Sequence, residues 1–164
     1  MEPLVRAYEG KADFYVLYTR EAHPGENYPA HESFSDKMND ARDLKRFEPV
    51  ERTILVDDLE GTMHTDYGAR PNSVYVIGKD GIILFRADWN DPEAVQVQLD
   101  RLFQNDGNAS GLEPVDITDD FTGIDGGAVN TAMRVMKRAG YTSIVDFAVS
   151  SMNLFQGRIA AQRN

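Results

Sequence analysis

Residues 73–86 read SVYVIGKDGIILFR and predict a β-hairpin. Two runs of β-branched and other apolar side chains, residues 73–77 and 82–86, flank the glycine-containing segment GKDG. A polar segment of this length is typical of the turn between two antiparallel strands. The two runs are therefore expected to be antiparallel neighbours in one sheet.

Helices are predicted on both sides of this hairpin. Downstream, Asp91, Pro92 and Glu93 supply an N-cap, a first-turn proline and a first-turn acid, and the following run carries apolar residues at helical spacing. Upstream, Ser33 is a suitable N-cap for an amphipathic helix over residues 33–47. The hairpin is thus expected to lie between two helices in the chain.

Two further β-prone runs lie on either side of the helix predicted over residues 33–47. Residues 14–18 read FYVLY and residues 53–56 read TILV. The first run is continuously apolar, which favours a strand buried on both faces, as in a parallel sheet. Apolar residues at i, i+3, i+4 and i+7 predict a short helix over residues 2–9. The order of these elements predicts an α/β domain over residues 1–104.

The chain changes character after residue 104. Residues 105–125 contain six acidic residues and no Lys or Arg, which predicts a solvated acidic linker. Residues 126–164 carry two apolar helical stripes interrupted at Gly140 and predict an αα-hairpin. A DNA-binding helix-turn-helix is the alternative, and the small number of basic residues in this segment disfavours it.

Composition excludes several classes of function. The 164 residues have a formal net charge of -10, which disfavours binding to nucleic acid and to anionic lipid. The chain has no cysteine, so its own side chains cannot form disulfides, thiolate metal sites or a thiol nucleophile. No stretch reaches the ~18 apolar residues of a membrane span, and the first residues do not resemble a signal peptide. A cytoplasmic protein is expected.

Four short motifs occur in order along residues 1–104. They read YTREAHP at residues 18–24, PAH at 29–31, LVDD at 55–58 and YGARP at 67–71. Together they resemble the motifs of iodothyronine deiodinases and of their bacterial redoxin relatives, which are related to the AhpC/TSA family. The resemblance implies a thioredoxin-like mixed sheet flanked by helices and a family chemistry of thiol- or selenol-dependent reduction.

The resemblance also implies that the chain lacks part of the family's domain. In that family a preceding strand and helix hold a cysteine or selenocysteine, and residues 2–9 are similar to the end of that helix. We therefore expect a truncation before the nucleophile, a sheet without its first strand, and a chain that is inactive alone. Either the C-terminal helices or a second copy of the chain is expected to cover the sheet edge and apolar face left open.

Five residues are candidates for a remnant of the family's pocket. The resemblance implies that Glu21, His23 and His31 line it as catalytic residues, with a histidine assisting proton delivery. Arg70 and Pro71 are similar to the family's substrate-facing segment, and the resemblance implies a cis peptide bond before Pro71. The competing interpretation is that these polar side chains only form hydrogen bonds within their loops.

A metal site is a further alternative for the histidines. It would gather His23, His31 and His64 with Asp57 or Asp58, but their spacing matches no compact metal motif. No metal and no cofactor is therefore expected.

Two functions remain open from the sequence. The chain is part of a deiodinase-like redoxin, with a thiol reductant system or a small-molecule substrate as partner if an upstream segment exists. Alternatively, it is a non-catalytic thioredoxin-like module that binds another protein, or a second copy of itself as a homodimer.

Overall fold

The computed structural model describes residues 1–117 and 126–161, with side chains described for residues 1–117, 130 and 132–152. The expected acidic linker lies partly outside the described residues. The elements, in chain order, are α1 (Glu2–Ala7), β1 (Tyr15–Tyr18), α2 (Phe34–Phe47), β2 (Thr53–Val56), α3 (Thr62–Asp66), β3 (Val74–Ile77), β4 (Ile83–Ala87), α4 (Pro92–Gln104), β5 (Val115–Ile117), α5 (Gly126–Ala139) and α6 (Tyr141–Ala161).

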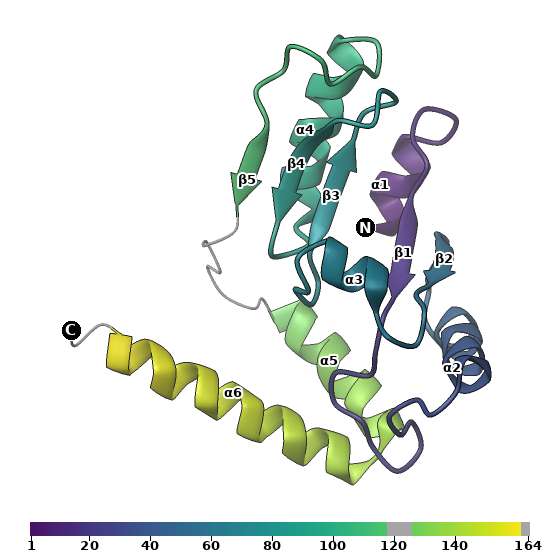
Figure 1. Cartoon of the computed structure of the whole chain (residues 1–164), viewed down its shortest axis with the longest axis vertical. Coiled ribbons are helices and arrows are strands. Elements are labelled where there is room, and N and C mark those ends of the chain that lie inside the picture. Colours follow the sequence, from purple (N-terminus) through teal and green to yellow (C-terminus); the bar gives the residue numbers. More distant parts are fainter. Residues whose placement is uncertain (118–125, 162–164) are drawn as a thin grey trace.

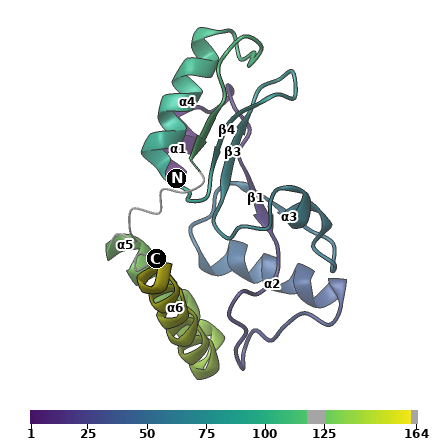
Figure 2. The same ribbon diagram turned by 60° about the vertical axis from the view of Figure 1, so that its left-hand side comes forward.

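The architecture is mixed α/β and is compatible with a thioredoxin-like fold (Figure 1). β1 and β2 form a two-stranded parallel sheet, and β3, β4 and β5 form a second sheet in that order. β3 and β4 are antiparallel, as the hairpin sequence predicts, with an irregularity in register between Val76 and Ile77. In Figure 2, α4 and α3 lie on opposite sides of this second sheet.

Local capping positions the two longer helices of the first 104 residues. The Ser33 hydroxyl accepts the backbone N–H of Asp36 at the start of α2, and the Asp91 carboxylate accepts that of Glu93 at the start of α4. Both caps were predicted from the sequence. The short helix α3 was not predicted; its first backbone N–H groups are held by the carboxylates of the two acids that follow β2.

The main core lies between α4, α1 and the second sheet. Its side chains come from elements far apart in the sequence and comprise Leu4, Tyr8, Val76, Leu84, Phe85, Ala87, Val95, Leu99, Leu102 and Ala109. The inner face predicted for α4 is confirmed, because Val95, Leu99 and Leu102 are all buried. Burial of these apolar side chains is the dominant stabilising contribution.

Two features of the sheets differ from expectation. Tyr15 in β1 is 56% exposed, so β1 is not buried on both faces. The reason is the position of Tyr15 at the start of the strand, where it borders an open pocket. The segment expected to be a linker contains β5, which pairs in parallel with β4 through Phe85 and Val115, and Ala109 joins the core. Backbone pairing and apolar burial therefore give regular structure to part of a segment whose acidic composition predicts a solvated linker.

The predicted helical hairpin is present, with Gly140 between α5 and α6 at a φ of 123°. Side chains of this helical hairpin contact the loop of residues 23–28 and the C-terminal end of α2. There Arg134 and Arg138 both pair with Glu48, and Arg138 also lies over the ring of Phe47. The expectation that it covers the sheet is not met by the described residues.

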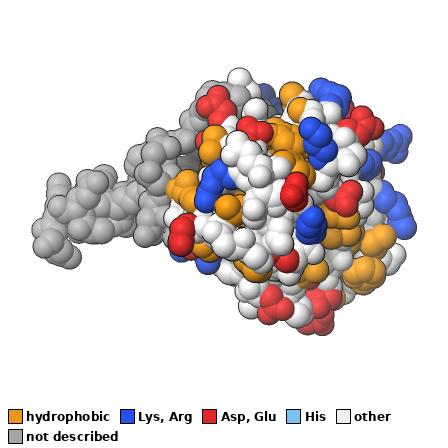
Figure 3. All heavy atoms as spheres, turned by 90° about the horizontal axis from the view of Figure 1, so that it is seen from above, with side chains coloured by type: hydrophobic (Ala, Val, Ile, Leu, Met, Phe, Trp, Pro, Cys, Tyr) orange, Lys and Arg blue, Asp and Glu red, His pale blue; other side chains and the backbone are white. Residues whose placement is uncertain are grey.

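The surface carries both signs of charge despite the net charge of -10. In the face seen in Figure 3, acidic and basic side chains are interspersed with apolar ones. Among the described residues, no helix is both long enough and apolar enough to cross a membrane.

Candidate functional site

The structure brings together Glu21, His31 and Asp40. The Nε2 atom of His31 lies 3.1 Å from Oδ2 of Asp40 and 4.0 Å from Oε1 of Glu21. The three ligand-type atoms all lie within 4.8 Å of one another. We call these three residues the carboxylate–histidine cluster.

Three segments of the chain position the cluster. Glu21 follows the end of β1, and the hydroxyl of Tyr18, the last residue of that strand, donates a hydrogen bond to Oε1 of Glu21. His31 lies two residues before the N-cap of α2, and Asp40 lies on the second turn of that helix. Because α2 packs against β2 and β2 pairs with β1, the fold holds the strand end and the helix together.

Burial governs the electrostatics of the cluster. The side chain of His31 is only 4% exposed, and those of Glu21 and Asp40 are largely buried. Burial raises the pKa of Asp40, while His31 opposes that shift through charge and a hydrogen bond. Burial and the hydrogen bond to Glu21 raise the pKa of Tyr18 far above its ordinary value of 10. Tyr18 therefore remains a neutral donor to Glu21 throughout the physiological pH range.

An open pocket reaches the cluster from solvent. It is lined by Pro29, Ala30, His31, Glu32, Asp36, Asn39 and Asp40. His31 and Asp40 thus face a space that water or a small ligand can enter. Glu21 does not line this pocket and is hydrogen-bonded to Tyr18.

The predicted pocket residues separate into two groups. Glu21 and His31 belong to the cluster, but Nδ1 of His23 lies 2.6 Å from Oδ2 of Asp146 in α6, and its ring packs edge-on against Phe147. His23 is therefore engaged in docking the helical hairpin. The family resemblance placed His23 in the same pocket as Glu21 and His31, whereas its hydrogen bond in the structure is to a residue 123 positions later in the chain.

Arg70 and Pro71 lie in an exposed loop between α3 and β3. The Nε atom of Arg70 is 3.6 Å from Oδ2 of Asp88, beyond the end of β4. The prediction of a cis peptide bond before Pro71 is wrong, since the described residues contain no cis peptide bond. Pro71 and Asn72 form a turn in which Asn72 has a φ of 60°. Proline followed by a residue of positive φ is typical of a type II turn with a trans proline.

The alternative metal set is not brought together either. Asp57 accepts backbone N–H groups of Met63 and His64 and so caps α3. His23 is bound to Asp146, as described above. His31 is the one member of that set which joins a cluster of possible ligands among the described residues.

Two residues of this region were not predicted from the sequence. Asp40 belongs to a row of acids at helical spacing, Asp36, Asp40 and Asp43, which is the one signal that could have found it. Lys37 is almost fully buried, and its Nζ donates to the carbonyl oxygen of Asp58 at 2.5 Å, which ties α2 to the end of β2.

Replacing Tyr18 by phenylalanine is expected to lower the free energy of unfolding by about 1–2 kcal/mol at pH 7, because a carboxylate loses its donor. A tyrosine whose pKa is raised on folding contributes stability that is present below its unfolded pKa and is lost as pH rises above it. The decline in stability above pH ~10 should thus be shallower in Tyr18→Phe. Urea denaturation between pH 7 and pH 11 measures both effects. Tyr15→Phe, on the same strand with a largely exposed ring, is the control; equal changes in both variants would contradict the prediction.

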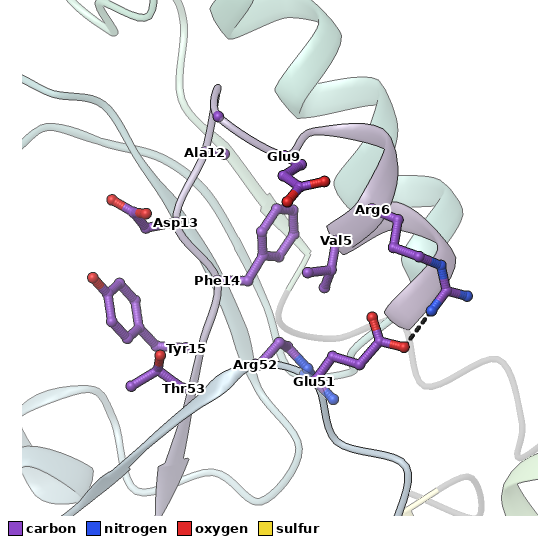
Figure 4. Close-up of a pocket in the computed structure, with 11 residues that line it drawn as sticks. Val5, Arg6, Glu9, Ala12, Asp13, Phe14, Tyr15, Glu51, Arg52 and Thr53 are labelled. Atoms are coloured by element: carbon purple, nitrogen blue, oxygen red, sulfur yellow. Dashed lines mark hydrogen bonds and ion pairs between the residues drawn. The ribbon is translucent and has the colours of Figure 1, made fainter.

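A second pocket lies between α1 and the starts of β1 and β2 (Figure 4). Three of its charged residues form ion pairs: Arg6 with Glu51, and Arg52 through its Nε with Oε1 of Glu2 at 3.1 Å. These pairs join α1 to the segment before β2, and we assign them a structural role.

Comparison with characterised proteins points to deiodinases. The chain is 30% identical over 103 residues to the thyroxine 5-deiodinase of Sus scrofa, a match that covers 57% of this chain and 33% of that protein. It is 29% identical over 103 residues to the human enzyme of the same name, with the same coverage. It is 33% identical over 92 residues to the type II iodothyronine deiodinase of Petromyzon marinus, covering 50% of this chain and 32% of that protein.

The similarity is partial in both directions. It spans about a third of the length of these relatives and about half of this chain. No protein-family model matches the sequence. The chain is deiodinase-like over the matched region.

Proposed function

We propose that this chain is a thioredoxin-fold domain of a deiodinase-like, redoxin-type oxidoreductase, in which the carboxylate–histidine cluster handles protons. The observation that carries the proposal is the pairing of Glu21 and His31 at the end of β1, next to an open pocket. The similarity to deiodinases supports the reaction class, which is reduction by a thiolate or selenolate.

The chemistry needs a nucleophile that these residues do not supply. None of the 164 residues is a cysteine, and Ser and Thr hydroxyls cannot undergo the same redox cycle. The thiolate or selenolate therefore comes from a group outside this sequence. Its attack on a halogen or a peroxide oxygen leaves a carbanion or an alkoxide, which must gain a proton.

His31 is placed to deliver that proton. Its Nε2 is hydrogen-bonded to Asp40, and the ring borders the pocket. The raised pKa of Asp40 makes this carboxyl easier to protonate than an ordinary aspartate, so it can pass a proton to the imidazole. Glu21, which accepts a hydrogen bond from Tyr18, places a second carboxylate 4.0 Å from the same nitrogen.

The test uses the complete reading frame that contains these 164 codons. We expect it to encode an upstream Cys or selenocysteine, and its product to show dithiothreitol-dependent deiodinase or peroxidase activity. The 164-residue chain alone should show no turnover above a heat-treated control. In the longer product, His31→Asn should lower kcat/KM by about 100-fold, the usual contribution of general acid catalysis.

His64→Asn is the matched control, because His64 lies on α3, outside the cluster. It should retain activity. Turnover by the 164-residue chain, or a reading frame without an upstream Cys or selenocysteine, would refute the proposal.

A non-catalytic, protein-binding module is the second candidate. The specific observation is an exposed apolar row along α6, at helical spacing, formed by Tyr141, Val145, Val149 and Met152. Exposed rows of this kind mark surfaces that bind another helix or a second copy of the chain. A reading frame that lacks a redox residue would favour this candidate.

A further inference from the structure

The geometry points to a divalent transition-metal site formed by Glu21, His31 and Asp40. The inference is independent of the proposed oxidoreductase function, because it rests on the positions and charges of three side chains in this chain. The ion is of the class that accepts mixed nitrogen and oxygen ligands, such as Zn²⁺ or Mn²⁺.

The ligand atoms are close enough to share one ion. Metal–ligand distances of roughly 2.0–2.2 Å place neighbouring ligand atoms about 3–4 Å apart. The separations from Nε2 of His31 are 3.1 Å to Asp40 and 4.0 Å to Glu21, and no pair exceeds 4.8 Å. Small rotations of the two carboxylates would therefore bring all three atoms onto a single cation.

The charge of the cluster favours a cation. Two largely buried carboxylates meet here, and within the described part of the chain neither forms an ion pair with Lys or Arg. Asp36 and Asp43, on the same helix, add further negative charge near Asp40. Buried carboxylates are costly unless they are paired, protonated or bound to a metal. A divalent ion would neutralise both.

The surroundings fit a site rather than a chance approach of side chains. The ring of His31 is more than nine-tenths buried, which restricts its orientation. The hydroxyl of Tyr18 holds Glu21, as outer-shell hydrogen bonds commonly hold metal-binding carboxylates. The pocket in front of His31 and Asp40 provides an entry path and room for water ligands to complete the coordination.

Metal binding and proton delivery require the same nitrogen. An ion on Nε2 of His31 takes the place of the hydrogen bond between this atom and Oδ2 of Asp40. A bound ion would thus hold the cluster in a state that cannot protonate a substrate. The cation would act on the oxidoreductase, if the proposed function is correct, as an inhibitor.

The test is direct metal binding by the 164-residue chain. After treatment with a chelator, we expect isothermal titration with Zn²⁺ to give one ion per chain, and Co²⁺ to give visible absorption bands of a nitrogen- and oxygen-ligated ion. Glu21→Gln, His31→Asn and Asp40→Asn should each weaken binding by at least about tenfold, since loss of a ligand exceeds the effect of losing an outer-shell partner. Circular dichroism establishes that each variant is folded.

The controls are His64→Asn, an imidazole on α3, and Glu9→Gln, an exposed carboxylate beyond α1. Both should bind Zn²⁺ as the original chain does. If the original chain gives no saturable isotherm, or if folded cluster variants bind as tightly as it does, the site does not exist. Neither result depends on activity, so failure here leaves the proposed function standing.

Discussion

Replacing Phe85 by alanine is expected to lower the free energy of unfolding by about 3–5 kcal/mol. Phe85 is 1% exposed and lies at the centre of β4, where it faces Val76 of β3 and Val115 of β5. The substitution removes its apolar contacts and leaves a cavity that three paired strands cannot close. Since small domains are stable by only about 5–15 kcal/mol, a large share of the stability should be lost.

Urea denaturation followed by circular dichroism measures this change. Val97→Ala is the matched control, because Val97 lies on α4 with more than half of its surface exposed and should change stability by less than about 0.5 kcal/mol. A loss below about 1.5 kcal/mol for Phe85→Ala would mean that the second sheet and α4 do not form the main core.

Replacing Gly25 by alanine is expected to loosen the helical hairpin from the loop of residues 23–28. A Cβ atom at Gly25 would lie 2.4 Å from the carbonyl oxygen of Ala139 and 3.1 Å from Cβ of Ser143. Ala139 and Ser143 are buried, and the clash is with backbone, so the two segments must separate. Overpacking of this kind costs about 1–3 kcal/mol.

Separation would also break the hydrogen bonds around the clash. Glu26 accepts from the backbone N–H of Thr142, and Asn27 donates to the carbonyl oxygens of Arg138 and Ala139. Hydrogen exchange in α5 and the first turns of α6 should therefore accelerate by at least about tenfold, which corresponds to about 1.4 kcal/mol. Exchange in α4 should not change.

Gly10→Ala provides the control for this experiment. The site is open, with no atom within 4 Å of the added methyl group, although its φ of 72° makes any side chain there strained. That strain should remain near α1 and leave exchange in α5 unchanged. If Gly25→Ala also leaves α5 protected, the loop does not hold the hairpin in the manner described.

Several elements could be predicted because their causes are local. The turn GKDG, the caps Ser33 and Asp91, and the stop at Gly140 each act over three or four residues, and the structure contains the hairpin and helices that they indicate. The deiodinase-like motifs also led to Glu21 and His31, which do meet. Their meeting follows from a strand end and a helix start that adjacent segments bring together.

Other features depended on contacts that no local pattern encodes. β5 forms because Val115 pairs with β4, thirty residues earlier in the chain. His23 pairs with Asp146 and Phe147 of α6 and not with His31. Asp40 joins the cluster because α2 packs against β2, which pairs with β1. The sequence by itself determined the β3–β4 hairpin and the helices other than α3, whose hydrogen bonds join near neighbours. The tertiary structure alone decided which charged and imidazole groups share a buried site, because that depends on how distant segments pack.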